Sequence, residues 1–323
     1  MRKYRYICLL AAWILAVGPA AQAAKAKLTT HKEMTSRLAT LEAIDSIFGH
    51  NRLHVVSIGK SVKGKDILLV AVSSPESRAD DTKRLFVICR QHGDEPAPTE
   101  AMLDLIEDLV LTDSSATAEL LTKVSFYMVP MVNPDGADHY GRRNAAGVDL
   151  NRDWLTLSQP ETRAVRVAID DIQPDVFIDE HELSPNNSRS DFIESAGPIC
   201  GALPEVVDGS AEIQKQIVGM LRTHDITVRS LQIDDQHPAR LAHRYFPVHH
   251  DTMSFLFETR QSGYRQYQLQ YRMKLHIVGT MTVAKCLAGQ DDSLRQRIAE
   301  HDASRRWIQL ASRGKKQSPQ RSK

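Results

Sequence analysis

Short apolar runs rich in Val, Ile and Phe recur along the chain and constrain its fold more than any other feature. They lie at 67–73, 85–89, 124–132, 176–178 and 254–257, and each is typical of a strand buried in a sheet. Apolar residues at helical spacing occur between them at 99–111, 211–221 and 265–287. Strands that alternate with helices predict an α/β fold with a central, mostly parallel mixed sheet flanked by helices.

Polar motifs follow four of these runs at the point where each strand is expected to end. They begin after Cys89, Val132, Ile178 and Phe257. In open α/β sheets, functional sites lie at the carboxyl ends of the strands. We therefore expect these four loops to meet at one edge of the sheet and to form the site.

The chain divides into a leader, one large domain and a tail. Residues 1–23 combine basic residues, an apolar stretch from Ile7 to Val17 and an Ala-Gln-Ala end, which predicts a secretory signal peptide and a periplasmic or secreted protein. The apolar stretch is well short of the ~20 residues that a spanning helix needs, so no stable membrane span is expected. Residues 24–290 are expected to form one folded domain, and residues 291–323 a polar, basic tail that is partly disordered.

Charge and cysteine content exclude several other classes of protein. The formal net charge is +1, which gives no reason to expect nucleic acid as a partner. Cys89, Cys200 and Cys286 follow the leader, and none lies in a C-x-x-C pair, which argues against a disulfide framework and against a thiolate zinc site. One bridge among these three residues is left open, as is the oligomeric state.

The first motif, H-G-D-E, brings an imidazole and a carboxylate three residues apart after a strand. Its candidate ligands are His92 and Glu95. Zinc binds both ligand types at ~2.0–2.2 Å and in catalytic sites takes three protein ligands and a water. Alone, an H-x-x-E pattern is a weak signal, because a loop histidine beside a surface glutamate has the same spacing.

The second segment makes the signal specific. It contains N-P-D-G at 133–136, R-R-N at 142–144 and G-V-D-L-N-R at 147–152. In this order, after H-x-x-E, the motifs resemble the zinc carboxypeptidase family, which includes pancreatic carboxypeptidases and bacterial murein peptide amidases. The resemblance covers about residues 85–287 and implies the phosphorylase/hydrolase-like α/β fold and one Zn²⁺ ion.

The resemblance also implies roles for residues of the second segment. Asn151 and Arg152 would hold the terminal carboxylate of a peptide substrate, since a guanidinium binds a carboxylate with two-pronged geometry. Arg142 would stabilise the oxyanion, and Arg143, the next residue, is the alternative. Asp149 would orient His92 by accepting its other ring N–H.

Two later strands supply the remaining candidates. His181, at the end of the strand from Val176, is the expected third metal ligand; Glu180 and Glu182 compete with it, but alternation places them on the opposite face. Glu258 directly follows the run at 254–257 and matches the catalytic base of the family.

The sequence thus predicts a zinc-dependent metallocarboxypeptidase that uses a promoted water. Three alternatives stay open: a murein peptide amidase that cuts γ-D-glutamyl-diaminopimelate bonds, a deacylase like succinylglutamate desuccinylase or aspartoacylase, and a non-catalytic zinc- or peptide-binding protein. The specificity pocket is expected between Gln232 and Thr252, where His237, Arg240, His243 and Arg244 favour an acidic or polar substrate group. Tyr245 does not match the spacing of the substrate-covering tyrosine of pancreatic enzymes, so its role is open.

Overall fold

A computed structural model describes residues 28–77, 82–233, 240–261 and 268–289. The predicted signal peptide and tail lie outside the described residues. The strands are β1 (Leu53–Lys60), β2 (Asp66–Val72), β3 (Lys83–Cys89), β4 (Val124–Val129), β5 (Val176–Leu183), β6 (Phe192–Ser195), β7 (Arg229–Gln232) and β8 (Met253–Arg260). The helices are α1 (His31–Phe48), α2 (Ala97–Leu111), α3 (Ser115–Lys123), α4 (Pro134–Asp138), the 3₁₀ turn η1 (Leu150–Arg152), α5 (Pro160–Ile172), α6 (Pro204–Thr223), α7 (Ala242–His249) and α8 (Leu269–Leu287).

Within the described residues, one mixed sheet has the strand order β1-β2-β4-β3-β5-β8-β6-β7. Its centre, β4-β3-β5-β8, is parallel throughout, and antiparallel pairs join β1, β2 and β6 to it. The predicted α/β fold with a mostly parallel central sheet is therefore confirmed. Every residue of β5 is buried, which is expected for a central strand covered on both faces.

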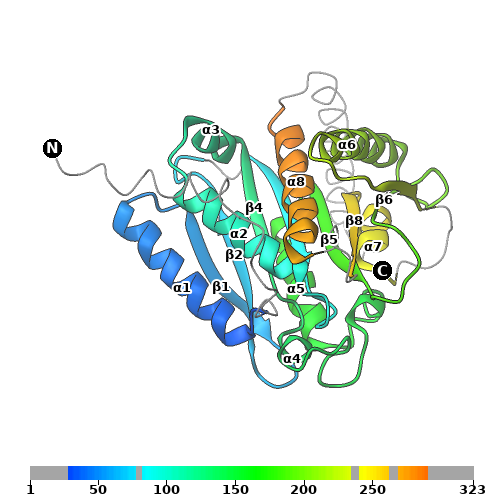
Figure 1. Ribbon diagram of the computed structural model, residues 1–323, viewed down its shortest axis with the longest axis horizontal. Coiled ribbons are helices and arrows are strands. Elements are labelled where there is room, and N and C mark those ends of the chain that lie inside the picture. Colours follow the sequence, from blue (N-terminus) through cyan, green and yellow to red (C-terminus); the bar gives the residue numbers. More distant parts are fainter. Residues whose placement is uncertain (1–27, 78–81, 234–239, 262–267, 290–323) are drawn as a thin grey trace, which may run out of the picture.

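Helices cover both faces of the sheet (Figure 1). The larger core lies on the side of α1, α2, α3, α6 and α8, where their apolar stripes pack against alternate residues of the strands. The smaller core lies on the side of α5 and α7 and is centred on Trp154, Phe177 and Phe246. Because β3, β5 and β8 run parallel, their carboxyl ends lie together at one edge of the sheet.

The sequence located most of the central strands and missed elements at the periphery. The strand predicted at 124–132 ends at Val129, because Pro130 follows it and cannot donate to a ladder. Helix α1 was not predicted, although its Thr30–Glu33 capping box is present. Met34, Leu38 and Leu41 form its buried face, but the apolar Ile47 and Phe48 are exposed, which weakens the contrast between its two faces. Strand β1 was missed as well, since it is an edge strand with several exposed positions.

Two expectations about the described residues concern membranes and cysteines. No helix among them is long and apolar enough to cross a membrane. Cys89, Cys200 and Cys286 form no disulfide bond with one another, and Cys89 and Cys286 are buried in the larger core.

Candidate functional site

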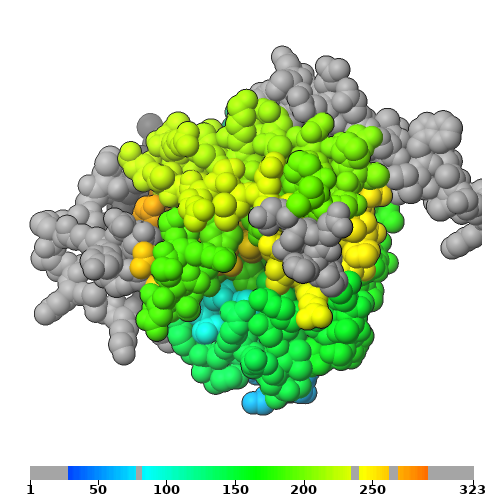
Figure 2. Space-filling model, turned by 90° about the vertical axis from the view of Figure 1, so that its right-hand side faces the viewer, coloured from blue at the N-terminus to red at the C-terminus, as the bar shows by residue number. Residues whose placement is uncertain are grey.

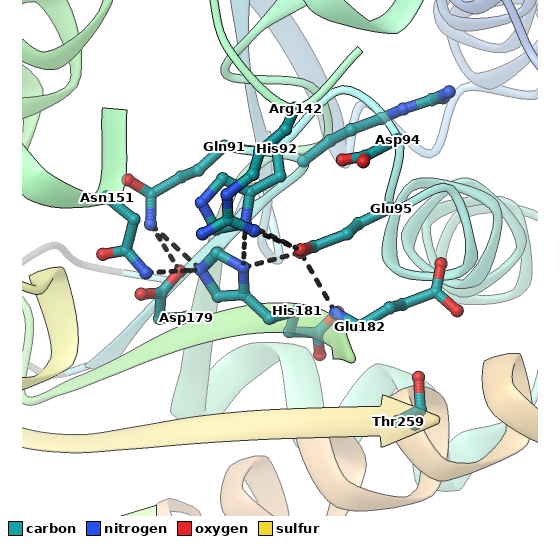
Figure 3. Close-up of polar contacts among 12 residues, drawn as sticks. Gln91, His92, Asp94, Glu95, Arg142, Asn151, Asp179, His181, Glu182 and Thr259 are labelled. Carbon is teal, nitrogen blue, oxygen red and sulfur yellow. Dashed lines mark hydrogen bonds and ion pairs between the residues drawn. The ribbon is translucent and has the colours of Figure 1, made fainter. Parts of the chain in front are cut away.

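Three of the predicted side chains meet at the carboxyl edge of the sheet (Figure 3). The Nδ1 atom of His92 lies 2.7 Å from Glu95 Oε1, and Nδ1 of His181 lies 2.7 Å from Glu95 Oε2. The two histidine nitrogens are 3.1 Å apart, and all three side chains are buried. Their ligand atoms lie within 4.8 Å of one another, a spacing that can hold a metal ion.

The loop after β3 turns sharply to deliver His92 and Glu95. Arg90 has a left-handed backbone with φ of 58°, and its guanidinium is buried and donates to the Gly93 carbonyl oxygen at 3.1 Å. Gly93 packs against the N-P-D-G turn so closely that a Cβ atom there would lie 2.1 Å from the carbonyl carbon of Gly136. This close approach requires glycine in H-G-D-E and fixes one motif against the other.

The outer ring nitrogens of both histidines face carboxylates. The Nε2 atom of His92 lies 3.0 Å from Asp149 Oδ1, which is the contact that the resemblance implied. Asp179 Oδ1, which the sequence analysis did not single out, lies 2.9 Å from Nε2 of His181. Since neutral histidine binds a metal through one nitrogen and donates from the other, both carboxylates are placed to orient a ligand.

The electrostatics of the cluster match a site for a cation. Burial disfavours the charged ring of His181, but the carboxylates of Asp179 and Glu95 outweigh this effect and raise its pKa well above the usual value. Burial also opposes ionisation of Glu95, yet the charges of His92 and His181 lower its pKa. The shared positive charge is therefore favourable here, and a divalent metal would replace the protons between these groups. Two imidazoles and one carboxylate are a ligand set that zinc accepts in catalytic sites.

Glu258 stands beside the cluster on β8, where it pairs in register with His181 of β5. Burial raises the pKa of Glu258 to about 8, while the nearby positive charge of His181 opposes the rise. Its Oε2 atom is buried and has no hydrogen-bond partner among the described residues. A bound cation would lower the pKa of Glu258, because a nearby opposite charge favours the ionised form. The carboxyl group would then be ionised at a lower pH.

The three arginines of the second segment lie differently. Arg142 reaches the cluster: its Nη1 is 3.4 Å from Glu95 Oε1, and its Nη2 donates to Asp149 Oδ2 at 3.0 Å. Arg143 is exposed and donates to the Gly147 carbonyl oxygen at 2.9 Å, so the structure brings Arg142 and not Arg143 to the cluster. Arg152 lines a cleft that opens beside the cluster.

Asn151 also lines the cleft, but both the oxygen and the nitrogen of its side-chain amide already have partners. Its Oδ1 accepts from the Ala242 backbone N–H at 3.1 Å, and its Nδ2 lies 3.0 Å from Nε2 of His181. Tyr245, whose role was open, accepts a hydrogen bond from Arg166 at 2.6 Å and is absent from the described residues that line the cleft.

The competing carboxylates Glu180 and Glu182 point away from the cluster. Glu180 contacts Thr280 at 2.8 Å, and Glu182 contacts Arg272 at 3.1 Å, both on α8. Figure 3 shows Glu182 directed away from the two histidines.

The cleft beside the cluster has a volume of about 270 Å³. Figure 2 shows this side of the molecule, with a hollow between green and yellow segments and cyan atoms within it. Glu194 of β6 lines the cleft and contacts Arg244 at 2.8 Å and His243 at 3.2 Å. Of the four basic residues predicted for the specificity pocket, His243 and Arg244 line the cleft and Arg240 does not, while His237 lies outside the described residues. Glu194 gave no signal in the sequence, because only the β6–β8 pairing brings it to the site.

Asp153 holds the loop that follows the G-V-D-L-N-R motif. Its Oδ1 accepts from Thr156 Oγ1 and Ser158 Oγ, both at 2.6 Å, and its Oδ2 accepts from the Gln159 N–H at 2.9 Å and from Thr162. Burial opposes its ionisation, but hydrogen bonds led by Ser158 outweigh burial and lower its pKa.

Asp153→Asn is expected to lower the free energy of unfolding by about 2–4 kcal/mol, because an amide NH₂ cannot accept these bonds. A depressed pKa stabilises the fold above the unfolded-state value, so the difference from the wild type should hold from pH 5 to 7 and shrink below about pH 4. Urea unfolding at several pH values measures this difference. Asp113→Asn, in an exposed loop, is the control, and an equal loss in both variants would contradict the assignment.

Comparisons with known proteins agree with this geometry. A family model described as zinc carboxypeptidase matches residues 49–186. Carboxypeptidase 2 of Trichophyton rubrum is 28% identical over 172 residues, which cover 52% of this chain and 32% of that protein. The matching segment thus spans only about a third of that relative's length.

Solved structures show the same fold. A metallo-carboxypeptidase from Burkholderia cenocepacia aligns with a TM-score of 0.65 and 23% identity, covering 79% of this chain and 68% of that chain. A metallo-carboxypeptidase from Pseudomonas aeruginosa, in complex with (2-guanidinoethylmercapto)succinic acid, gives a TM-score of 0.62 and 25% identity over 81% of this chain and 69% of that chain. The predicted resemblance is confirmed, and the single zinc ion of the family is the cofactor that the His92, Glu95 and His181 set fits.

Proposed function

We propose, from the match of residues 49–186 to the zinc carboxypeptidase family, that the protein is a zinc-dependent metallocarboxypeptidase that hydrolyses the peptide bond next to a free C-terminal carboxylate. The observation that carries this proposal is the convergence of three metal-ligand side chains with Glu258, Arg142 and Arg152 around one cleft. A bound zinc ion supplies a water of lowered pKa, toward ~7, and polarises a carbonyl group.

The side chains around the metal divide the remaining work. Glu258 takes the proton of the attacking water and passes it to the leaving amine, since it lines the cleft and its buried Oε2 has no hydrogen-bond partner among the described residues. Arg142 extends its guanidinium toward the cluster, where its N–H groups stabilise negative charge on the carbonyl oxygen. Arg152 binds the substrate carboxylate, and Asn151 lies beside it in the same cleft.

The cleft favours a substrate whose C-terminal residue is polar over one whose C-terminal residue is basic or apolar. Glu194 is the carboxylate that a basic side chain would seek, but Arg244 and His243 already neutralise it. Burial of an apolar side chain against this ion pair would desolvate it at a cost. Arg189, at the rim of the cleft, adds a further positive charge.

These features also keep the murein peptide amidase as the second candidate. Cell-wall peptides carry additional carboxylates, and a paired Glu194 and Arg244 would suit a substrate side chain with both charges. The predicted signal segment, which lies outside the described residues, would bring the enzyme to the periplasm or outside the cell, where such peptides occur.

Incubation with a panel of substrates tests the proposal. The panel contains peptides ending in Glu, Lys or Phe, the murein tripeptide and an N-acyl amino acid, and mass spectrometry identifies the products. We expect loss of one C-terminal residue, with Lys-ending peptides cleaved least. Cleavage of the murein tripeptide alone would favour the amidase, and cleavage of the acyl amino acid alone would favour the deacylase. If no substrate were cleaved, the result would favour a non-catalytic zinc-binding protein.

A further inference from the structure

Asp179 is a buried carboxylate that the proposed reaction does not use. It lies in the middle of β5, two residues before His181, and is 0% exposed. Its Oδ1 atom lies 2.9 Å from Nε2 of His181. Placing a carboxylate in the core is costly, so its position here needs an explanation beyond packing.

The Oδ1 atom of Asp179 is held by a hydrogen bond. Gln91 Nε2 donates to it at 2.7 Å, and the orientation of this amide is fixed because Gln91 Oε1 accepts from the Trp154 indole N–H at 2.8 Å. The Oδ2 atom has no hydrogen-bond partner among the described residues and faces Nδ1 of the buried His243 at 3.9 Å. The hydrogen bond from Gln91 therefore keeps Oδ1 directed at His181.

The contact between Asp179 and His181 decides where the proton of the imidazole sits. At 2.9 Å, an unprotonated Nε2 would direct its lone pair at a buried carboxylate oxygen, which is repulsive. Two amide nitrogens face the same ring nitrogen and favour the opposite tautomer: Asn151 Nδ2 lies 3.0 Å and Gln91 Nε2 lies 3.3 Å from it. The Gln91 amide lies closer to Asp179, to which it donates at 2.7 Å. The charged acceptor prevails, because hydrogen bonds to ionised groups are about twice as strong as neutral ones.

We propose that Asp179 is the positioning residue that fixes His181 in the Nε2–H form, so that Nδ1 carries no proton and faces the metal. Asp149 makes the equivalent contact with His92 at 3.0 Å. Each histidine ligand is thus backed by its own carboxylate, the first from the G-V-D-L-N-R loop and the second from within strand β5. This inference rests on the proposed zinc site and does not require peptidase activity.

Zinc affinity of the full-length protein, measured by competition with a chromophoric chelator, tests the proposal. Asp179→Asn keeps the shape and loses the charge, and we expect its zinc dissociation constant to rise about 10- to 100-fold. Asp149→Asn should show a rise of similar size. Asp45→Asn is the matched control, because Asp45 is equally buried but accepts from the Arg52 and Leu53 N–H groups far from the cluster, and its zinc affinity should equal that of the wild type.

A second measurement needs no variant and decides the matter if Asp179→Asn does not fold. Long-range ¹H–¹⁵N spectra of the zinc-loaded wild type report the tautomer of each histidine. The proposal predicts a protonated Nε2 on His181 with slow hydrogen exchange. An Nδ1–H form, or an Asp179→Asn zinc affinity within twofold of the wild type, overturns it. A protein that binds zinc as expected but cleaves no peptide would overturn the proposed function and leave this inference standing.

Discussion

Glu258→Gln is expected to leave the zinc affinity close to that of the wild type and to lower kcat by about 10²- to 10⁴-fold. Glutamine has nearly the same shape, but its amide cannot take a proton from water. Glu258 is also not one of the three groups whose ligand atoms cluster. Metal content and steady-state rates, measured on the same preparation, separate these two effects.

Glu194→Gln is the comparison for this experiment. It removes a second carboxylate that lines the same cleft, but one that Arg244 and His243 already neutralise. We expect this variant to change KM far more than kcat. An undiminished kcat in Glu258→Gln would remove Glu258 from the mechanism, and equal losses of kcat in both variants would show that any change in the cleft has the same effect.

Arg152→Ala is expected to lower kcat/KM for peptides with a free C-terminus by about 10²- to 10³-fold. Arg152 is exposed in the free protein, and a bound substrate carboxylate would cover it; loss of one partner of a charge pair buried in this way costs about 2–5 kcal/mol. The guanidinium lines the cleft and is held by its donation to the Asn151 carbonyl oxygen at 2.9 Å. Peptide assays on the wild type and the variant measure the loss.

Peptides with an amidated C-terminus show whether the loss concerns the carboxylate. The wild type should cleave them poorly, and Arg152→Ala should cleave them no worse than the wild type does. The exposed Arg143, which donates to Gly147, is the matched control, and Arg143→Ala should keep normal rates. A loss of the same size on free and amidated peptides would contradict a role for Arg152 in binding the carboxylate.

Local sequence was sufficient to predict the parts of the site that each motif carries alone. The H-G-D-E motif supplies two ligand candidates in one turn, and the apolar runs before His181 and Glu258 are strands that end at the same edge. The signal was local in each case, because a buried strand followed by a polar residue places that residue at the carboxyl end of the sheet.

Contacts between distant segments could not be predicted in this way. Whether Arg142 or Arg143 faces the cluster depends on the path of the loop after α4, which the motif does not specify. Gln91 and Asp179 are 88 positions apart and meet only because β3 pairs with β5. Glu194 needs the antiparallel pairing of β6 with β8, and short strands of this kind leave little periodic pattern.

The most direct test of the central claim is cleavage by the protein before and after its metal is removed. Zinc content is measured on protein treated with a chelator and dialysed, and release of the C-terminal residue from a free peptide is followed by mass spectrometry. We expect one zinc ion per chain in the active protein, no release from the metal-free protein, and recovery of the rate on addition of one equivalent of zinc. Undiminished release by the metal-free protein would contradict the account.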